Sequence, residues 1–67
     1  MKFKDFIDMY DDWNGEMVVN DDNLSPIVAG NTYHIVKNRE DLYDKDVVAF
    51  GFYDNQLCVR VKWRRGA

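Results

Sequence analysis

Two β-rich runs near the end of the chain, Val47-Val48-Ala49-Phe50-Gly51-Phe52-Tyr53 and Gln56-Leu57-Cys58-Val59-Arg60-Val61-Lys62-Trp63, decide the fold. Only Asp54-Asn55 separates them, and these residue types favour the positive φ angles of a two-residue turn. We therefore predict an antiparallel hairpin. The second run alternates apolar and polar residues, as expected for a strand with one solvated face. The first run is apolar on both sides, which predicts either a central strand or a strand whose outer face meets a partner.

The N-terminal part of the chain predicts a helix and a second hairpin. Residues 2–10 place apolar side chains at helical spacing, at Phe3, Phe6, Ile7 and Tyr10. Glu16 to Asn20 has the composition of a strand, and the polar cluster that follows predicts a loop that leads into Ile27 to Ala29, with Pro26 at the start of an edge strand. Such a short helix is stable only when it docks on a sheet.

The middle of the chain connects the two hairpins. Thr32 or Asn31 could cap a helical turn over residues 33–36, although the same residues would also fit a strand. Leu42 and Tyr43 are the apolar anchors of a polar connection. Together the elements predict an α+β fold in which an N-terminal helix packs on a four-stranded antiparallel sheet built from two hairpins.

Size and composition limit the classes of protein. The chain has 67 residues, of which 46% are hydrophobic and 15% aromatic, so we expect one domain over residues 1–67, with residues 64–67 as a flexible tail. A single cysteine excludes an intramolecular disulfide and a multi-thiolate zinc site. Because the sequence contains neither a membrane-length apolar run nor a signal-peptide pattern, we expect a cytoplasmic protein.

The charge is distributed unevenly along the chain. Residues 1–56 contain all twelve acidic residues and five of the nine basic ones, a net charge of −7, whereas residues 57–67 carry +4. An acidic body opposes general nucleic-acid binding, because phosphate neutralisation requires a basic surface. The basic end could still touch a phosphate or an acidic partner, or it could only keep the edge of the sheet soluble.

The inventory of chemical groups argues against an enzyme. The chain has one histidine and one cysteine and lacks hydrolase and phosphate-loop motifs. His34 and Cys58 could form a base and nucleophile pair, but a structural Cys58 within a strand is the favoured interpretation. The acids of Asn20-Asp21-Asp22-Asn23 do not have the spacing of a calcium loop, and we expect no metal and no cofactor.

The aromatic residues give the best indication of function, because ten of them are more than one small core encloses. Tyrosine and tryptophan beside carboxylates can anchor a protein partner while the acids steer it. For any single ring, capping the end of a thin core is an equally good explanation. The partner-binding residues predicted on this basis are Tyr10, Asp11, Asp12, Trp13, Asp21 and Asp22.

Phe6, Asp12-Trp13-Asn14-Gly15 and the stretch from Leu42 to Leu57 resemble small uncharacterised accessory proteins of bacteriophages and prophages of Gram-positive bacteria. The resemblance implies a class that includes anti-CRISPR proteins and other inhibitors of host defence. Many members of that class are small acidic domains that occupy a basic surface of a host enzyme. The partner implied here is a protein with a basic surface, such as a CRISPR effector or another defence nuclease.

Three hypotheses about function are compatible with the sequence. The leading hypothesis is a non-enzymatic protein-binding module, most concretely a phage-encoded inhibitor of a host defence nuclease. The alternative is a nucleic-acid-binding accessory factor that uses Arg60, Lys62, Trp63, Arg64 and Arg65. A third is an oligomer that captures a nucleotide signal between its chains. The sequence leaves the oligomeric state open, a dimer included.

Overall fold

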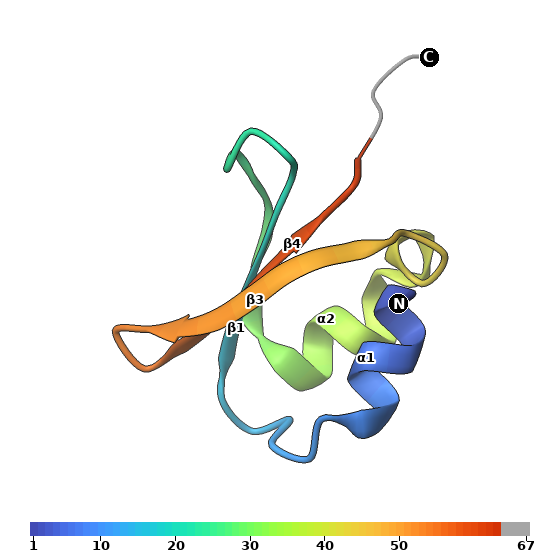
Figure 1. Cartoon of the computed structure of the whole chain (residues 1–67). Coiled ribbons are helices and arrows are strands. Elements are labelled where there is room, and N and C mark those ends of the chain that lie inside the picture. Colours follow the sequence, from blue (N-terminus) through green and yellow to red (C-terminus); the bar gives the residue numbers. More distant parts are fainter. Residues whose placement is uncertain (64–67) are drawn as a thin grey trace.

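The computed structural model describes residues 1–63 and has a layer of short helices on one side of a sheet (Figure 1). The predicted tail, residues 64–67, lies outside the described residues. The elements, in chain order, are α1 (Phe3–Met9), β1 (Glu16–Asn20), β2 (Pro26–Asn31), α2 (Thr32–Asn38), a 3-10 turn η1 (Glu40–Leu42), β3 (Val47–Tyr53) and β4 (Gln56–Val61).

Both predicted hairpins are confirmed. β1 pairs antiparallel with β2, and β3 pairs antiparallel with β4. Asp54 and Asn55 have φ angles of 53° and 64°, which are the left-handed values that a tight two-residue turn requires. Pro26 opens β2 at one edge of the sheet, where its missing N–H removes no ladder hydrogen bond.

The sheet is mixed, and the prediction of a purely antiparallel sheet was wrong. The strand order is β2-β1-β4-β3, and the two hairpins are joined by a parallel pairing of β1 with β4, in which Met17 lies opposite Leu57. The reason is the connection between the hairpins. Residues 32–46, with α2 and η1, carry the chain back to the end of the sheet where β2 began, so that β3 starts there and runs parallel to β2.

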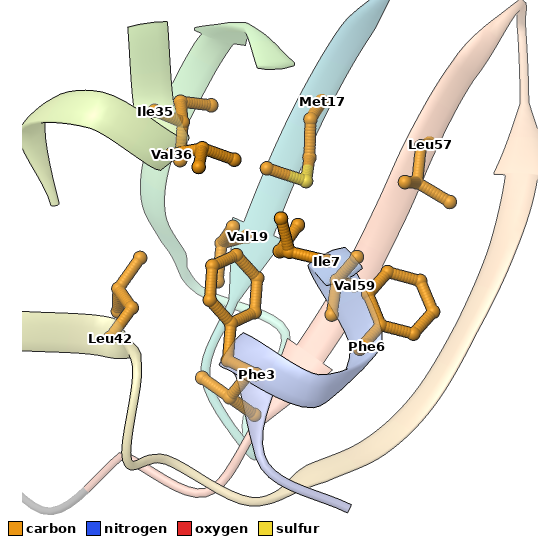
Figure 2. Packing of buried hydrophobic residues seen from close by; sticks show 11 residues of the cluster. Phe3, Phe6, Ile7, Met17, Val19, Ile35, Val36, Leu42, Leu57 and Val59 are labelled. Atoms are coloured by element: carbon orange, nitrogen blue, oxygen red, sulfur yellow. The ribbon is translucent and has the colours of Figure 1, made fainter. Parts of the chain in front are cut away.

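Two helices share the covered face of the sheet, where a single N-terminal helix was expected. The helical interpretation of residues 33–36 is confirmed, because α2 begins after Asn31, whose side-chain oxygen accepts a hydrogen bond from the His34 N–H. Side chains of α1, α2 and η1 form one buried cluster with the inward side chains of β1 and β4 (Figure 2). Its helical members are Phe3, Phe6, Ile7, Ile35, Val36 and Leu42.

β3 is an edge strand, and the alternative that made it the central strand was wrong. The two central strands, β1 and β4, are the ones whose inward residues are almost fully buried, whereas alternate residues of β3 are exposed. The covering helices have only seven residues each. The helical layer therefore leaves β3 incompletely covered.

Candidate functional site

An apolar groove lies between α1 and β3. Its volume is about 280 Å³, and apolar atoms form almost all of its lining. The lining residues are Met1, Phe6, Met9, Tyr10, Phe50, Phe52 and Leu57. Phe6 and Leu57, which belong both to this lining and to the buried cluster, are seen from close by in Figure 2. The groove is therefore a continuation of the core toward the surface.

The pairing of β3 with β4 determines why two phenylalanines border this groove. Phe50 lies opposite Val59 and Phe52 lies opposite Leu57, so both rings point to the face on which the core is built. Phe50 contacts Phe6 with a centroid separation of 4.8 Å. Nevertheless Phe50 and Phe52 remain 62% and 63% exposed, because the helices within residues 1–63 cover them only in part. Two large rings on the core face of a sheet are thus left open to solvent.

Tyr10 lies at one end of the groove. Its ring is stacked on Phe6 at 6.1 Å and faces Phe52 at 6.3 Å. Burial raises the pKa of the Tyr10 hydroxyl, and the negative charge of Asp12 raises it further. Asp54 follows β3 at the same end, directly after Tyr53. The Tyr10 end of the groove is therefore acidic.

The lysines of the N-terminal segment do not offset this charge, because they are paired with other acids. Lys2 Nζ lies 3.0 Å from Asp46 Oδ1, and Lys4 Nζ lies 3.1 Å from Asp8 Oδ2. The hydrogen bond from Lys2 lowers the pKa of Asp46. Within the described residues, the groove thus combines exposed rings with unneutralised carboxylates at one end.

The structure places the predicted partner-binding residues in two separate groups. Tyr10, Asp11, Asp12 and Trp13 precede β1, whereas Asp21 and Asp22 follow its other end. Only Tyr10 lines the groove. The two acid pairs are separated by the full length of a strand and do not form one patch.

Asp21 has a structural role in its loop. It is 9% exposed, and its Oδ1 accepts hydrogen bonds from the backbone N–H groups of Asn23 and Ser25, each at 2.9 Å. These bonds hold the turn that begins the return into β2. The exposed Asp22 accepts one bond from the Trp63 N–H at 3.3 Å.

Trp13 is half-buried and packs on the start of α2. Its ring lies 6.5 Å from the ring of Tyr33, and its carbonyl oxygen accepts the Tyr33 N–H at 3.1 Å. These contacts correspond to the interpretation of a ring that caps the end of a thin core. Of the two predicted aromatic residues, Tyr10 is therefore the one that lines the groove.

The residues of the nucleic-acid alternative do not present an open stacking ring in the described part of the chain. Trp63 is half-buried, with Lys45 Nζ 5.4 Å from its ring centroid, and it packs against the core cluster. Arg60 is half-buried on the sheet face away from the helices, and Lys62 is exposed. Arg64 and Arg65 lie outside the described residues.

His34 and Cys58 do not meet. His34 is exposed on α2, on the helical side, whereas Cys58 alternates with the inward Leu57 and Val59 and so lies on the opposite face of the sheet. Among residues 1–63, no three or more His, Cys, Asp or Glu side chains are grouped to hold a metal ion.

Sequence reasoning did not identify Phe50, Phe52 and Met9 as site residues. The sequence did not point to the two phenylalanines, because they lie on the core face of β3, whereas the apolar composition of the strand pointed to its outer face. The exposure of Met9 has no sequence signal, because it depends on how the end of α1 packs in the fold.

Comparisons with known protein families, with curated proteins and with solved structures found no match to this chain. No helix within the described residues is both long and apolar enough to cross a membrane.

Proposed function

We propose that this protein is a non-enzymatic protein-binding module that binds its partner through the groove between α1 and β3. One observation carries the proposal: Phe50 and Phe52 are nearly two-thirds exposed beside an apolar groove, although they point to the core face of the sheet. Exposed apolar patches bordered by polar residues are typical of interaction sites. Aromatic residues are also the usual anchors of protein interfaces.

The groove suits a protein better than a small molecule. Its volume, about 280 Å³, is just below the range of about 300–1,000 Å³ that is typical of small-molecule pockets. Small-molecule sites also contain a few polar groups that orient the ligand, and here the lining is almost entirely apolar. A protein partner needs only complementary shape and an apolar centre.

The charge supports a basic partner. Asp12 and Asp54 lie at the Tyr10 end of the groove, and residues 1–56 carry a net charge of −7. Opposite potentials speed association and exclude partners of the wrong charge. We extend the proposal to the class of partner: an enzyme with a basic nucleic-acid-binding surface, such as a host defence nuclease, that this protein inhibits in the manner of an anti-CRISPR protein. The resemblance of the sequence to phage accessory proteins supports this extension.

Capture of partners from a bacterial lysate, with mass spectrometry, tests the proposal when matched variants are compared. Met9→Lys and Asp12→Lys add positive charge to the groove and to its acidic end, and both should lose the captured protein. Tyr33→Lys and Asp22→Lys make the same changes away from the groove and should retain it. Met9 and Tyr33 are 64% and 50% exposed, so neither change should disturb folding by more than about 0.5 kcal/mol.

Three results would contradict the proposal. The first is equal capture by all four variants. The second is capture that is lost only with Asp22→Lys. The third is a mobility shift of single-stranded DNA by the protein that is stronger than its binding to any captured protein, which would favour the nucleic-acid alternative.

A further inference from the structure

The outer edge of β3 carries backbone groups that point away from the sheet. Tyr53 and Gln56 flank the two-residue turn, so they form a hydrogen-bonded pair, and Gly51 with Cys58 forms the next one. Phe50 and Phe52 alternate with these residues. The backbone N–H and C=O groups of Phe50 and Phe52 therefore point away from β4, toward the open edge.

In the described part of the chain, only the beginning of this edge forms backbone hydrogen bonds on its outer side. The Val47 N–H donates to the Met1 carbonyl oxygen at 2.8 Å, and Lys2 forms a bridge with Asp46. Between Val47 and Ala49 the register with β4 shifts by a bulge. Within residues 1–63, the regular part of β3 beyond the bulge, with Phe50 and Phe52, has no backbone partner on its outer side.

The two edges of the sheet differ in how they are protected against pairing. β2 starts with Pro26 and contains Gly30 at a φ of 150°, and its pairing with β1 is irregular near Pro26. Proline and bulges are common devices that prevent edge strands from associating. Neither strand contains a charged residue, but β3 contains no proline from Val47 to Tyr53, and its bulge lies near its start, before Phe50. This uncharged edge has the properties of a pairing surface.

We propose that two copies of this protein associate through their β3 edges, as an antiparallel pair related by a two-fold axis at Gly51. Phe50 of each copy then lies opposite Phe52 of the other. All four outward backbone groups of Phe50 and Phe52 obtain partners in this register. The axis is perpendicular to the sheet, so the two grooves come together on the same face of one continuous sheet.

A register centred on Phe50 is less favourable. It places Phe52 opposite Val48, within the bulge, and Tyr53 opposite Val47, whose N–H is already bonded to Met1. It also places Asp46 opposite Asp54 of the other copy, and like charges that face each other across strands are destabilising. In the register centred on Gly51, Asp54 faces the apolar Val48, and no two charged residues are opposed.

The exposed area is sufficient for a weak specific dimer. Phe50, Phe52, Val48 and Met1 are between 47% and 63% exposed, and an aromatic side chain alone offers 150–250 Å², so the apolar patch covers roughly 400 Å² on each copy. Apolar atoms contribute about 60% of a typical interface, so the two copies together would bury at most about 1,300 Å² if the whole patch is covered. This is near the lower limit for a stable complex, and we expect a dissociation constant on the order of 1–100 μM.

Sedimentation of the purified protein between 1 and 300 μM, about the expected range, tests the association without any partner. We expect reversible dimers in the wild type and in Tyr33→Lys. Phe52→Lys should raise the dissociation constant at least about tenfold, because its ammonium group would enter the apolar centre. A wild type that is monomeric at the highest concentration overturns the proposal, and so does a dimer that Phe52→Lys leaves unchanged.

Cross-linking tests the register and does not depend on Phe52→Lys remaining folded. In Gly51→Cys with Cys58→Ser, the single cysteine lies on the axis, about 4.5 Å between Cα atoms from its copy, within the range for a disulfide. A Cβ at Gly51 would lie 3.2 Å from the ring of Tyr53, which is exposed and can rotate away. Ala49→Cys with Cys58→Ser is the matched control, because its cysteines are about 13 Å apart.

Oxidation by glutathione disulfide should link two copies of the Gly51→Cys protein covalently and leave the control without a covalent link. Linking of both, or of the control alone, overturns the two-fold at Gly51. Because these measurements use the protein by itself, they can fail while lysate capture still succeeds. A monomer that captures a basic partner would mean that a strand or helix of that partner, and not a second copy, covers β3.

Discussion

Asp21 and Asp22 are adjacent carboxylates that differ in burial and in the hydrogen bonds they accept. The sequence presents them as one polar loop, and nothing in their composition separates them. In the structure only Asp21 is buried, and it accepts two backbone N–H bonds from residues two and four positions later. Asp side chains commonly bond to the backbone just ahead of them, so such a turn was foreseeable here. Which of the two acids makes the bonds depends on the exit angle of β1, which local sequence does not specify.

Asp21→Ala should therefore destabilise the protein by about 1–3 kcal/mol, because two N–H groups in a partly buried loop lose their acceptor. Asp22→Ala removes the same charge from an exposed position and should cost no more than about 0.5 kcal/mol. Urea denaturation of both variants measures the difference. Equal free energies of unfolding would show that the loop does not depend on the Asp21 carboxylate.

At the scale of elements, the sequence predicted every strand and its hairpin partner but not how the hairpins join. The alternation in Gln56 to Val61 and the Asp54-Asn55 turn are local signals, and both were sufficient. The order of strands depends instead on the path of residues 32–46 across the helical face. That path is a non-local property, because Ile35, Val36 and Leu42 are buried in a core shared with strands far away in the sequence. For the same reason, the position of β3 at the edge, and with it the groove, was not predictable from the pattern of β3 alone.

The turn between β3 and β4 requires a left-handed backbone conformation at Asn55. Asn55 has a φ of 64°, and a residue with a Cβ pays roughly 1–2 kcal/mol for the left-handed conformation unless its side chain bonds locally. Asn55→Ala should therefore lower stability by about 1 kcal/mol, whereas Asn55→Gly should maintain it or raise it slightly. Thermal unfolding of the wild type and the two variants measures the order of their stabilities. A more stable Asn55→Ala protein would contradict the turn geometry.

At the scale of the whole molecule, the groove results from a mismatch between its two layers. Four strands are too wide for a layer of two seven-residue helices and a 3-10 turn. The strand left uncovered is the one whose sequence is apolar on both sides. A chain of 67 residues buries only about 60% of its unfolded surface, so leaving two phenylalanines exposed gives up stability that a domain of this size needs. Association through β3 would recover part of that loss.

Phe3 should therefore contribute more to the stability of the fold than Phe6. Phe3 is 0% exposed and enclosed on all sides, whereas Phe6 is 5% exposed and lines the groove. Phe3→Ala should cost about 4–5 kcal/mol, because it leaves a closed cavity. Phe6→Ala should cost about 3 kcal/mol, since Phe50 and Tyr10 can move into the space from the open side.

Urea denaturation compares these two variants with the wild type. If Phe3→Ala is unfolded without denaturant, Phe3→Leu and Phe6→Leu replace the pair, and the order should persist with smaller differences. A larger loss at Phe6 than at Phe3 would mean that the groove is closed in solution. The measurement should be made below 1 μM protein, about the lower end of the proposed dimer range, so that association does not add to the stability of the folded state.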